Sequence, residues 1–599
     1  MKREILKRGD WKRPLNMLLP ALFALFLLAC SEDFLEPEPL SFFAPENVYV
    51  DKAGFESGLV TVRRDLKRDF YSDRSCLQLD HVTSDFGFGI GMFDYTVITP
   101  SSGTYMPILP LFERIYGFIK NTNVIISRID NVEWEKESDR NEILSQALFY
   151  RTWWYYRLIH SYGDVPFIGY ELKGPKLDFY THSRWTILEK LISDMEFVVQ
   201  WLPEKTKIGV PNKYAAYHLL SKLYLANLDF DKAITAASAV IDGPYSLMKK
   251  RFGSDAADAT KNVIWDLHRP ENKSIAENTE SIFIVIDREE APPAAKIGSY
   301  LMRSYHCGWW YTWVLDSQGK SGTYAGGPQY DALGRANPDV NQSYWYSYEI
   351  WEDDTYSWKT TPDLRRASSI WWEVDKILYN RPASVDYNKP INPMNFAFPV
   401  DSFFIWPMPY HKTYYPHAPG FEGRPMGGAG DMYVFRLAET YLLRAEAYYW
   451  KNQLNQAASD INVVRGRANA PAISASEVDI DFIFDERLRE LAMEEFRHGE
   501  MVRVSNIMAK KNLNGYTLDN ISKKNWWYDR VMNYNTWYKM GSIGGRAPKI
   551  FKTEPRYIYW PIAINVITTN TMGVINQNEG YEGAENNIPP LTVIDEDEN

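Results

Sequence analysis

The sequence predicts a mostly α-helical fold, in which tetratricopeptide-like helical repeats form a scaffold that carries one large irregular insertion of loops and short strands. Apolar residues recur at helical spacing in several long stretches. Two helix pairs, residues 213–241 and 433–465, repeat one pattern 224 positions apart. Between them, residues 250–430 are rich in Gly, Pro, Tyr and Trp and lack long helical periodicity.

The N-terminus predicts a lipoprotein signal peptide over residues 1–29. Six basic residues and then the apolar run 17–29 precede Cys30, and this run is too short to span a bilayer comfortably. Residues 27–30 (LLAC) resemble a lipobox, although Leu28 is larger than usual in that slot. We therefore expect Cys30 to be acylated, which would hold the protein at a membrane. A secretory signal followed by a coincidental cysteine is the alternative.

The remaining elements follow in order. Residues 31–33 (SED) resemble the surface-export signal of Bacteroidetes lipoproteins, and the proline-containing residues 30–50 predict an extended tether. One domain is expected over residues 51–599, with helical repeats at about 105–245 and 431–510. Residues 280–287 (ESIFIVID) predict a strand. The expected helices are 111–129, 141–160, 185–201, 213–226, 231–241, 433–450 and 454–465.

The two matching helix pairs share large and small residues at equivalent places. Tyr217 matches Tyr441, while Ser221 matches Ala445. Small residues allow paired helices to approach closely, and aromatic residues fill the groove between them. Because two copies are too few for a regular array, we expect a solenoid that is interrupted by insertions.

Aromatic residues of the insertion are the first candidates for ligand binding. Nine of the 21 Trp lie between residues 309 and 406, and residues 306–313 read HCGWWYTW. Aromatic faces suit sugar rings, so Trp309, Trp310, Tyr311 and Trp313 are candidate ligand-binding residues. The alternative is that these side chains pack a satellite core or a protein contact.

Residues 85–95 (DFGFGIGMFDY) are the second candidate region. Glycines alternate there with aromatic residues, which predicts an exposed loop with aromatic tips. Asp85, Phe86 and Phe88 are the candidate binding residues of this loop. A buried hairpin is the competing interpretation.

Charge and motifs argue against several other functions. A net charge of −11 disfavours nucleic acid as a partner. No zinc spacing, phosphate loop or nucleophile elbow is present, so we expect no enzyme, no cofactor and no metal, although calcium at Asp353 and Asp354, or at Asp80 and Asp85, stays open. Glu486, Glu490 and Glu494 share a helical spacing, and we favour ion pairing with arginine over catalysis for them. Cys76 and Cys307 are expected to be buried thiols, with a disulfide as the alternative.

Ordered motifs along about 500 residues resemble the SusD/RagB family of nutrient-uptake lipoproteins. Residues 145–146 (SQ) depart from the Gly-Glu that the family often has. The matching segments are 34–37 (FLEP), 46–49 (ENVY), 121–123 (NTN), 162–166 (YGDVP), 435–439 (FRLAE), 445–447 (AEA), 461–462 (IN), 486–487 (ER), 490–491 (EL), 561–562 (PI) and 577–581 (QNEGY).

The resemblance implies a lipid-anchored protein of the outer membrane that faces the outside of the cell. It implies capture of an oligosaccharide without chemistry and its delivery to a SusC-like TonB-dependent transporter. Some family members are associated with peptides, so peptide uptake is the first alternative. A surface glycoside hydrolase, which needs two opposed carboxylates, and a scaffold that binds only protein are further alternatives.

Overall fold

A computed structural model describes residues 45–89, 98–102, 107–396, 404–543 and 549–594. Helices dominate it, as the sequence predicts, and its strands are few and short. Cys30, the expected signal peptide and most of the expected tether lie outside the described residues. The described part of that tether ends in the short helix α2 (Pro45–Val48).

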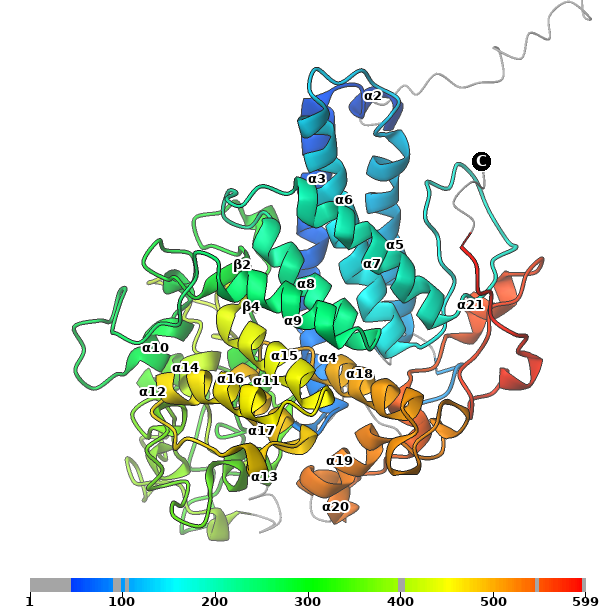
Figure 1. Cartoon of the computed structure of the whole chain (residues 1–599). Helices are drawn as coiled ribbons and strands as arrows, with labels where there is room; N and C mark the ends of the chain where they lie inside the picture. Colours follow the sequence, from blue (N-terminus) through cyan, green and yellow to red (C-terminus); the bar gives the residue numbers. More distant parts are fainter. Residues whose placement is uncertain (1–44, 90–97, 103–106, 397–403, 544–548, 595–599) are drawn as a thin grey trace, which may run out of the picture.

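Long helices stack in chain order to form the scaffold (Figure 1). Each of the successive neighbours α5 to α9 packs on the next, and α9 then packs on α15 across the insertion. The interrupted solenoid is therefore one continuous stack. Its members are α3 (Lys52–Phe70), α5 (Ile108–Arg128), α6 (Glu137–Ser161), α7 (Arg184–Trp201), α8 (Lys213–Ala226), α9 (Phe230–Ile241), α15 (Leu437–Trp450), α16 (Leu454–Arg467), α17 (Ile480–Leu491) and α18 (Arg497–Lys510).

The two helix pairs that share a sequence pattern, α8/α9 and α15/α16, have equivalent packing. Ser221 and Ala445 are fully buried at matching places, where a larger side chain would separate the paired helices. Tyr217 and Tyr441 are half-buried and pack against the core. The predicted alternation of large and small side chains is thus found in the packing of both helix pairs.

Strand β2 (Ser281–Val285) pairs antiparallel with β4 (Met432–Arg436) and closes the base of the insertion. The strand expected at residues 280–287 is therefore confirmed. The helix expected over residues 433–450 is wrong at its start, because residues 433–436 belong to β4 and the helix begins at Leu437. Every residue of β4 is buried, and a fully buried strand has no alternating pattern that distinguishes it from a helical turn.

Short elements fill the insertion and the two ends of the chain. Strand β1 (Gly87–Phe88) pairs with β3 (Asn341–Gln342), and β5 (Ser542–Ile543) pairs with β6 (Lys549–Ile550). The short helices are α4 (Cys76–Val82), α10 (Val263–His268), α11 (Leu301–Tyr305), α12 (Pro328–Leu333), α13 (Tyr344–Ser347), α14 (Tyr410–Thr413), α19 (Trp526–Tyr534), α20 (Thr536–Met540) and α21 (Ile564–Thr569).

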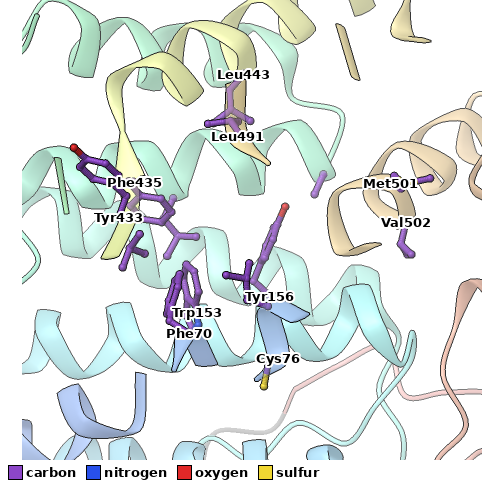
Figure 2. Packing of buried hydrophobic residues seen from close by; sticks show 14 of the residues in the cluster. Phe70, Cys76, Trp153, Tyr156, Tyr433, Phe435, Leu443, Leu491, Met501 and Val502 are labelled. Carbon is purple, nitrogen blue, oxygen red and sulfur yellow. The ribbon is translucent and has the colours of Figure 1, made fainter. Parts of the chain in front are cut away.

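Aromatic side chains from distant segments meet in the main core. Phe70 of α3 stacks on Trp153 of α6 with 6.1 Å between ring centroids, and Trp153 lies 5.8 Å from the ring of Phe435 in β4 (Figure 2). Cys76 and Cys307 are both buried and free, as expected. Among the described residues, no helix has the length and apolar character that a membrane crossing requires.

Candidate functional site

Three aromatic side chains of the insertion form a stack, which we call the aromatic ladder: Trp310, Tyr311 and Trp313. The rings of Trp310 and Tyr311 lie 4.8 Å apart at 21°, and those of Tyr311 and Trp313 lie 5.8 Å apart at 14°. The chain turns at residues 309–313 instead of running as a strand, so neighbouring side chains can share one side. A Cβ atom at Gly308 would lie 2.8 Å from the Tyr311 ring, so the ladder requires glycine there.

Hydrogen bonds hold two rings of the ladder, Trp310 at one end and Tyr311 in the middle. The indole Nε1 of Trp310 donates to the carbonyl oxygen of Ala336 at 2.6 Å, and the Tyr311 hydroxyl donates to Asn337 Oδ1 at 2.7 Å. The guanidinium of Arg335 lies 5.3 Å from the centre of the Trp310 ring. Trp310 and Tyr311 are half-buried, and their polar atoms are already bonded to the protein. What they offer to a ligand is therefore ring surface.

Beneath the ladder lies a second hydrophobic cluster, separate from the main core. Trp309 is completely buried in this cluster, and Trp313 is 8% exposed. The satellite core that the sequence left as an alternative is therefore real. Trp309 is corrected from a candidate ligand contact to a core residue, because no surface of it is available. The ladder positions with accessible rings are Trp310 and Tyr311, and their role in binding stays a prediction.

A cavity of about 520 Å³ opens next to the same cluster, and we call it the aromatic cleft. Trp406 belongs to the cluster and also lines the cleft. Tyr344, in α13, is 56% exposed and lies 4.7 Å from the ring of Tyr348. Polar atoms of Gln342, Ser347, Thr536 and Lys539 share the wall with Tyr344, Tyr348, Ile405, Trp406, Trp537 and Met540. Aromatic faces beside a few polar groups are the usual composition of a small-molecule site.

The cleft combines segments far apart in the chain. The Thr536 hydroxyl of α20 accepts a hydrogen bond from the Tyr344 backbone N–H of α13 at 2.9 Å, which joins the two walls. Figure 1 places both helices at the end of the molecule opposite α2. Sequence reasoning did not single out Tyr344 or Trp537. The aromatic density of residues 526–538 was the available signal.

The second candidate region is buried where the structure describes it. Phe86 and Phe88 are 0% and 3% exposed, and a Cβ atom at Gly87 would lie 2.4 Å from the carbonyl oxygen of Asn341 in the facing strand. Gly87 is therefore required for the close approach of the two strands, and it does not indicate a flexible loop. Where the structure describes it, the expected exposed loop is therefore corrected to a buried strand, and this strand pairs with residues 341–342 and not with a neighbouring strand of a hairpin. Residues 90–95 of that expected loop lie outside the described residues.

Asp85 is a structural anchor, not a ligand contact. Its carboxylate forms ion pairs with Arg497 and Arg530, both at 2.7 Å, and it has no exposed surface. Burial opposes ionisation, but the charges of Arg497 and Arg530 outweigh it and lower the pKa of Asp85 to about 2. We therefore correct Asp85 from candidate binding residue to the centre of a buried ion cluster.

Replacing Asp85 with Asn should lower the free energy of unfolding by about 3 kcal/mol at pH 7, because two buried guanidinium groups lose a partner. Since the folded pKa is depressed, the wild-type advantage is present above pH 4 or so and fades as pH falls toward about 2. Urea unfolding at several pH values measures this. Asp130→Asn, which breaks an ion pair whose carboxylate is 68% exposed, is the control and should cost under about 1 kcal/mol. Equal effects of both substitutions at pH 7 would contradict this role.

Other carboxylates that could carry chemistry are also engaged. Glu486 pairs with Arg365 and Arg465, each at 2.8 Å, and these charges outweigh burial and lower its pKa to about 2. Glu494 lies beyond the end of α17, so the expected shared helix face is wrong for it, and it pairs with Lys412 at 2.6 Å. Ion pairing, the interpretation we favoured, describes these side chains. The described residues contain no group of three or more His, Cys, Asp or Glu placed to hold a metal.

Comparison with known proteins decides the family. A model of the SusD family matches residues 314–581, and a second model, described as starch-binding associating with outer membrane, matches residues 92–225. The chain belongs to the SusD family. The matches cover most of the helical repeats and the part of the insertion from residue 314 onward, which includes the cleft, and they confirm the resemblance drawn from the motifs.

Individual proteins of the SusD family are also similar to this chain. The SusD-like protein P2 of Formosa agariphila is 25% identical over 36% of this chain and 44% of its own length. The starch-binding protein SusD of Bacteroides thetaiotaomicron is 30% identical over 27% of this chain and 24% of its own length. The chain thus matches less than half the length of these curated relatives. A laminarin-binding SusD-like protein superposes with a TM-score of 0.60 at 17% identity, covering 89% of this chain and all of that one, which shows the shared fold.

Two of these relatives are named as binding proteins, one for starch and one for laminarin. The mostly helical SusD-like fold is confirmed.

Proposed function

We propose that this SusD-like protein is a surface lipoprotein of the outer membrane that captures an oligosaccharide and passes it to a SusC-like TonB-dependent transporter. The observation that supports it best is the aromatic ladder. Two half-buried rings stack on each other on a rigid cluster, so a sugar can pack against the ring surface that stays uncovered while the protein gives up little side-chain entropy.

Capture needs no chemical step in this proposal. The ladder and the cleft supply apolar faces for the C–H surfaces of sugars, and the ammonium group of Lys539 can hydrogen-bond hydroxyl groups. The buried carboxylates described above are paired with arginine or lysine, so they are not poised for acid–base catalysis.

The proposed anchor is Cys30, and the arrangement of the described residues suits it. The described chain begins at α2, at the end of the molecule opposite α13 and α20 (Figure 1). Residues 30–44 would reach at most about 50 Å if fully extended. An anchor at that end leaves the cleft pointing away from it. The proposed partnership with a transporter rests on membership of the SusD family.

Isothermal titration of the full-length protein in detergent against a panel of oligosaccharides tests the proposal. Laminarin oligosaccharides and maltooligosaccharides head the panel, since two relatives are named for laminarin and starch. We expect at least one neutral oligosaccharide of four or more units to bind with a Kd on the order of 0.1 mM, or about −5.5 kcal/mol. Binding of peptides with no binding of any oligosaccharide would contradict glycan capture.

A further inference from the structure

A second cavity, of about 250 Å³, lies at the N-terminus of α7, away from the ladder and the cleft. Its wall combines the turn at Gly163 and Asp164, the first turn of α7, Asn506 of α18 and the C-terminal segments around Tyr559 and Asn576. None of its lining residues lines the aromatic cleft. We call it the Arg184 cavity, after the side chain that gives it its chemistry.

Arg184 lines this cavity with a buried charge that forms no ion pair among the described residues. The residue is 4% exposed, and its three guanidinium nitrogens make no hydrogen bond of good geometry, although the Tyr559 hydroxyl and the Asp164 carboxylate lie close enough to interact with it. Other buried arginines form direct ion pairs: Arg503 pairs with Glu446 at 2.6 Å, and Arg467 pairs with Glu280 at 3.0 Å. Because a buried charge without a directly bonded carboxylate is costly, the Arg184 cavity suits an anionic partner that the described chain does not bring into contact.

The carboxylates in the wall already have other bonds. Asp164 Oδ1 accepts a hydrogen bond from the backbone N–H of Arg184 at 2.8 Å, so it caps the start of α7. Glu579 accepts from the Ser522 hydroxyl at 2.6 Å and lies 3.2 Å from Lys523 Nζ. The positive end of the α7 helix also faces this place, which favours a negative group.

The remaining lining suits the body of a small polar ligand. The ring of Trp185 lies 5.1 Å from the Arg184 guanidinium, and Tyr559 adds a second ring, whose hydroxyl donates to Asn506 at 2.8 Å. The side-chain amides of Asn506, Asn576 and Asn587 each donate one hydrogen bond within the fold. Each amide therefore has a second N–H hydrogen to offer to a hydroxyl group.

We propose that the Arg184 cavity binds one acidic sugar unit, with its carboxylate on the guanidinium of Arg184. The planar fork of arginine matches a carboxylate with two parallel hydrogen bonds. A volume of about 250 Å³ corresponds to roughly eight water molecules, which is room for one six-membered ring with its substituents and not for a chain of them. This site is independent of the proposed role of the ladder in capturing oligosaccharides.

Ligand-observed NMR and isothermal titration with D-glucuronate test the proposal, with D-glucose as the neutral match and sulfate as an anion without a sugar ring. We expect glucuronate to bind the full-length protein at least about tenfold more tightly than either. Arg184→Met should lose at least tenfold in glucuronate affinity, and Arg184→Lys, which keeps the charge without the fork, should lose a similar factor. Arg140→Met removes an arginine whose side chain is 25% exposed and lies outside the cavity, and it should bind like wild type.

Two readouts separate a ligand site from a structural arginine. Without ligand, Arg184→Met should unfold at a temperature no lower than wild type, because it loses an unpaired charge. A clear fall in that temperature would mean that the fold itself satisfies the guanidinium, and it would overturn the proposal. Equal affinity for glucuronate and glucose, or unchanged affinity in Arg184→Met or Arg184→Lys, would overturn it as well. Loss of oligosaccharide binding through changes in the ladder would leave it standing.

Discussion

Replacing Glu490 with Gln should lower the free energy of unfolding by about 3–5 kcal/mol, because three buried guanidinium groups would lose the charge between them. Glu490 is 2% exposed and contacts Arg365 at 3.0 Å, together with Arg436 and Arg467. Burial opposes its ionisation, but Arg467, Arg436 and Arg365 hold its pKa well below the usual range of a glutamate. Denaturant unfolding followed by circular dichroism measures the loss.

The expected loss of stability in Glu490→Gln is large because the ion pairs of Glu490 connect several parts of the fold. Arg365 belongs to the insertion, Arg436 ends strand β4, Arg467 ends helix α16, and Glu490 lies in α17. One carboxylate thus ties the insertion to the repeats. Glu46→Gln, which breaks an ion pair whose carboxylate is 54% exposed, is the control and should cost under about 1 kcal/mol. Similar losses in both variants would mean that the buried cluster does not hold the insertion in place.

Removing both accessible rings of the ladder should nearly abolish oligosaccharide binding. In Trp310→Ala/Tyr311→Ala, we expect affinity for the best ligand of the panel to fall about 30-fold or more, since each ring should contribute about 1–2 kcal/mol through burial and stacking. Isothermal titration measures the change. Circular dichroism checks that the variant keeps its fold, because both side chains lie at the edge of a core cluster.

Trp358 is the matched control for the ladder. It is a half-buried tryptophan of the same insertion, with Arg366 at 4.6 Å and Lys359 at 5.0 Å from its ring, and it lines neither the ladder nor the cleft. Trp358→Ala should change oligosaccharide affinity less than about twofold. If it weakened binding as strongly as the ladder variant, a general loosening of the insertion would be the better explanation.

Periodicity predicted most of the scaffold. The expected helices at 141–160, 185–201 and 213–226 agree with α6, α7 and α8 to within a few residues, because each is a long run rich in apolar residues without Pro or Gly. Helix α3 was missed, although it runs from Lys52 to Phe70. Its buried residues Phe55, Leu59, Val62 and Leu66 do recur at helical spacing, so the signal was present among the many charged residues of this stretch.

The site was predictable as a region and not residue by residue. The run at 309–313 indicated an aromatic cluster in the insertion, which the structure contains, but a turn decides which ring of such a run faces the core, and composition carries no signal for that. Tyr344 and Trp537 lie 193 positions apart in the sequence, and only the tertiary fold brings both to the wall of the cleft. The same holds for Asp85, whose partner Arg497 is 412 residues away in the chain, so its pairing could not be predicted from local spacing.

A crystal structure of the protein with the tightest-binding oligosaccharide of the panel tests the central claim most directly. The account predicts a sugar ring packed against Trp310 or Tyr311, with sugar carbon atoms within about 4 Å of the aromatic ring. A fully occupied oligosaccharide bound elsewhere, with both rings bare, would contradict it.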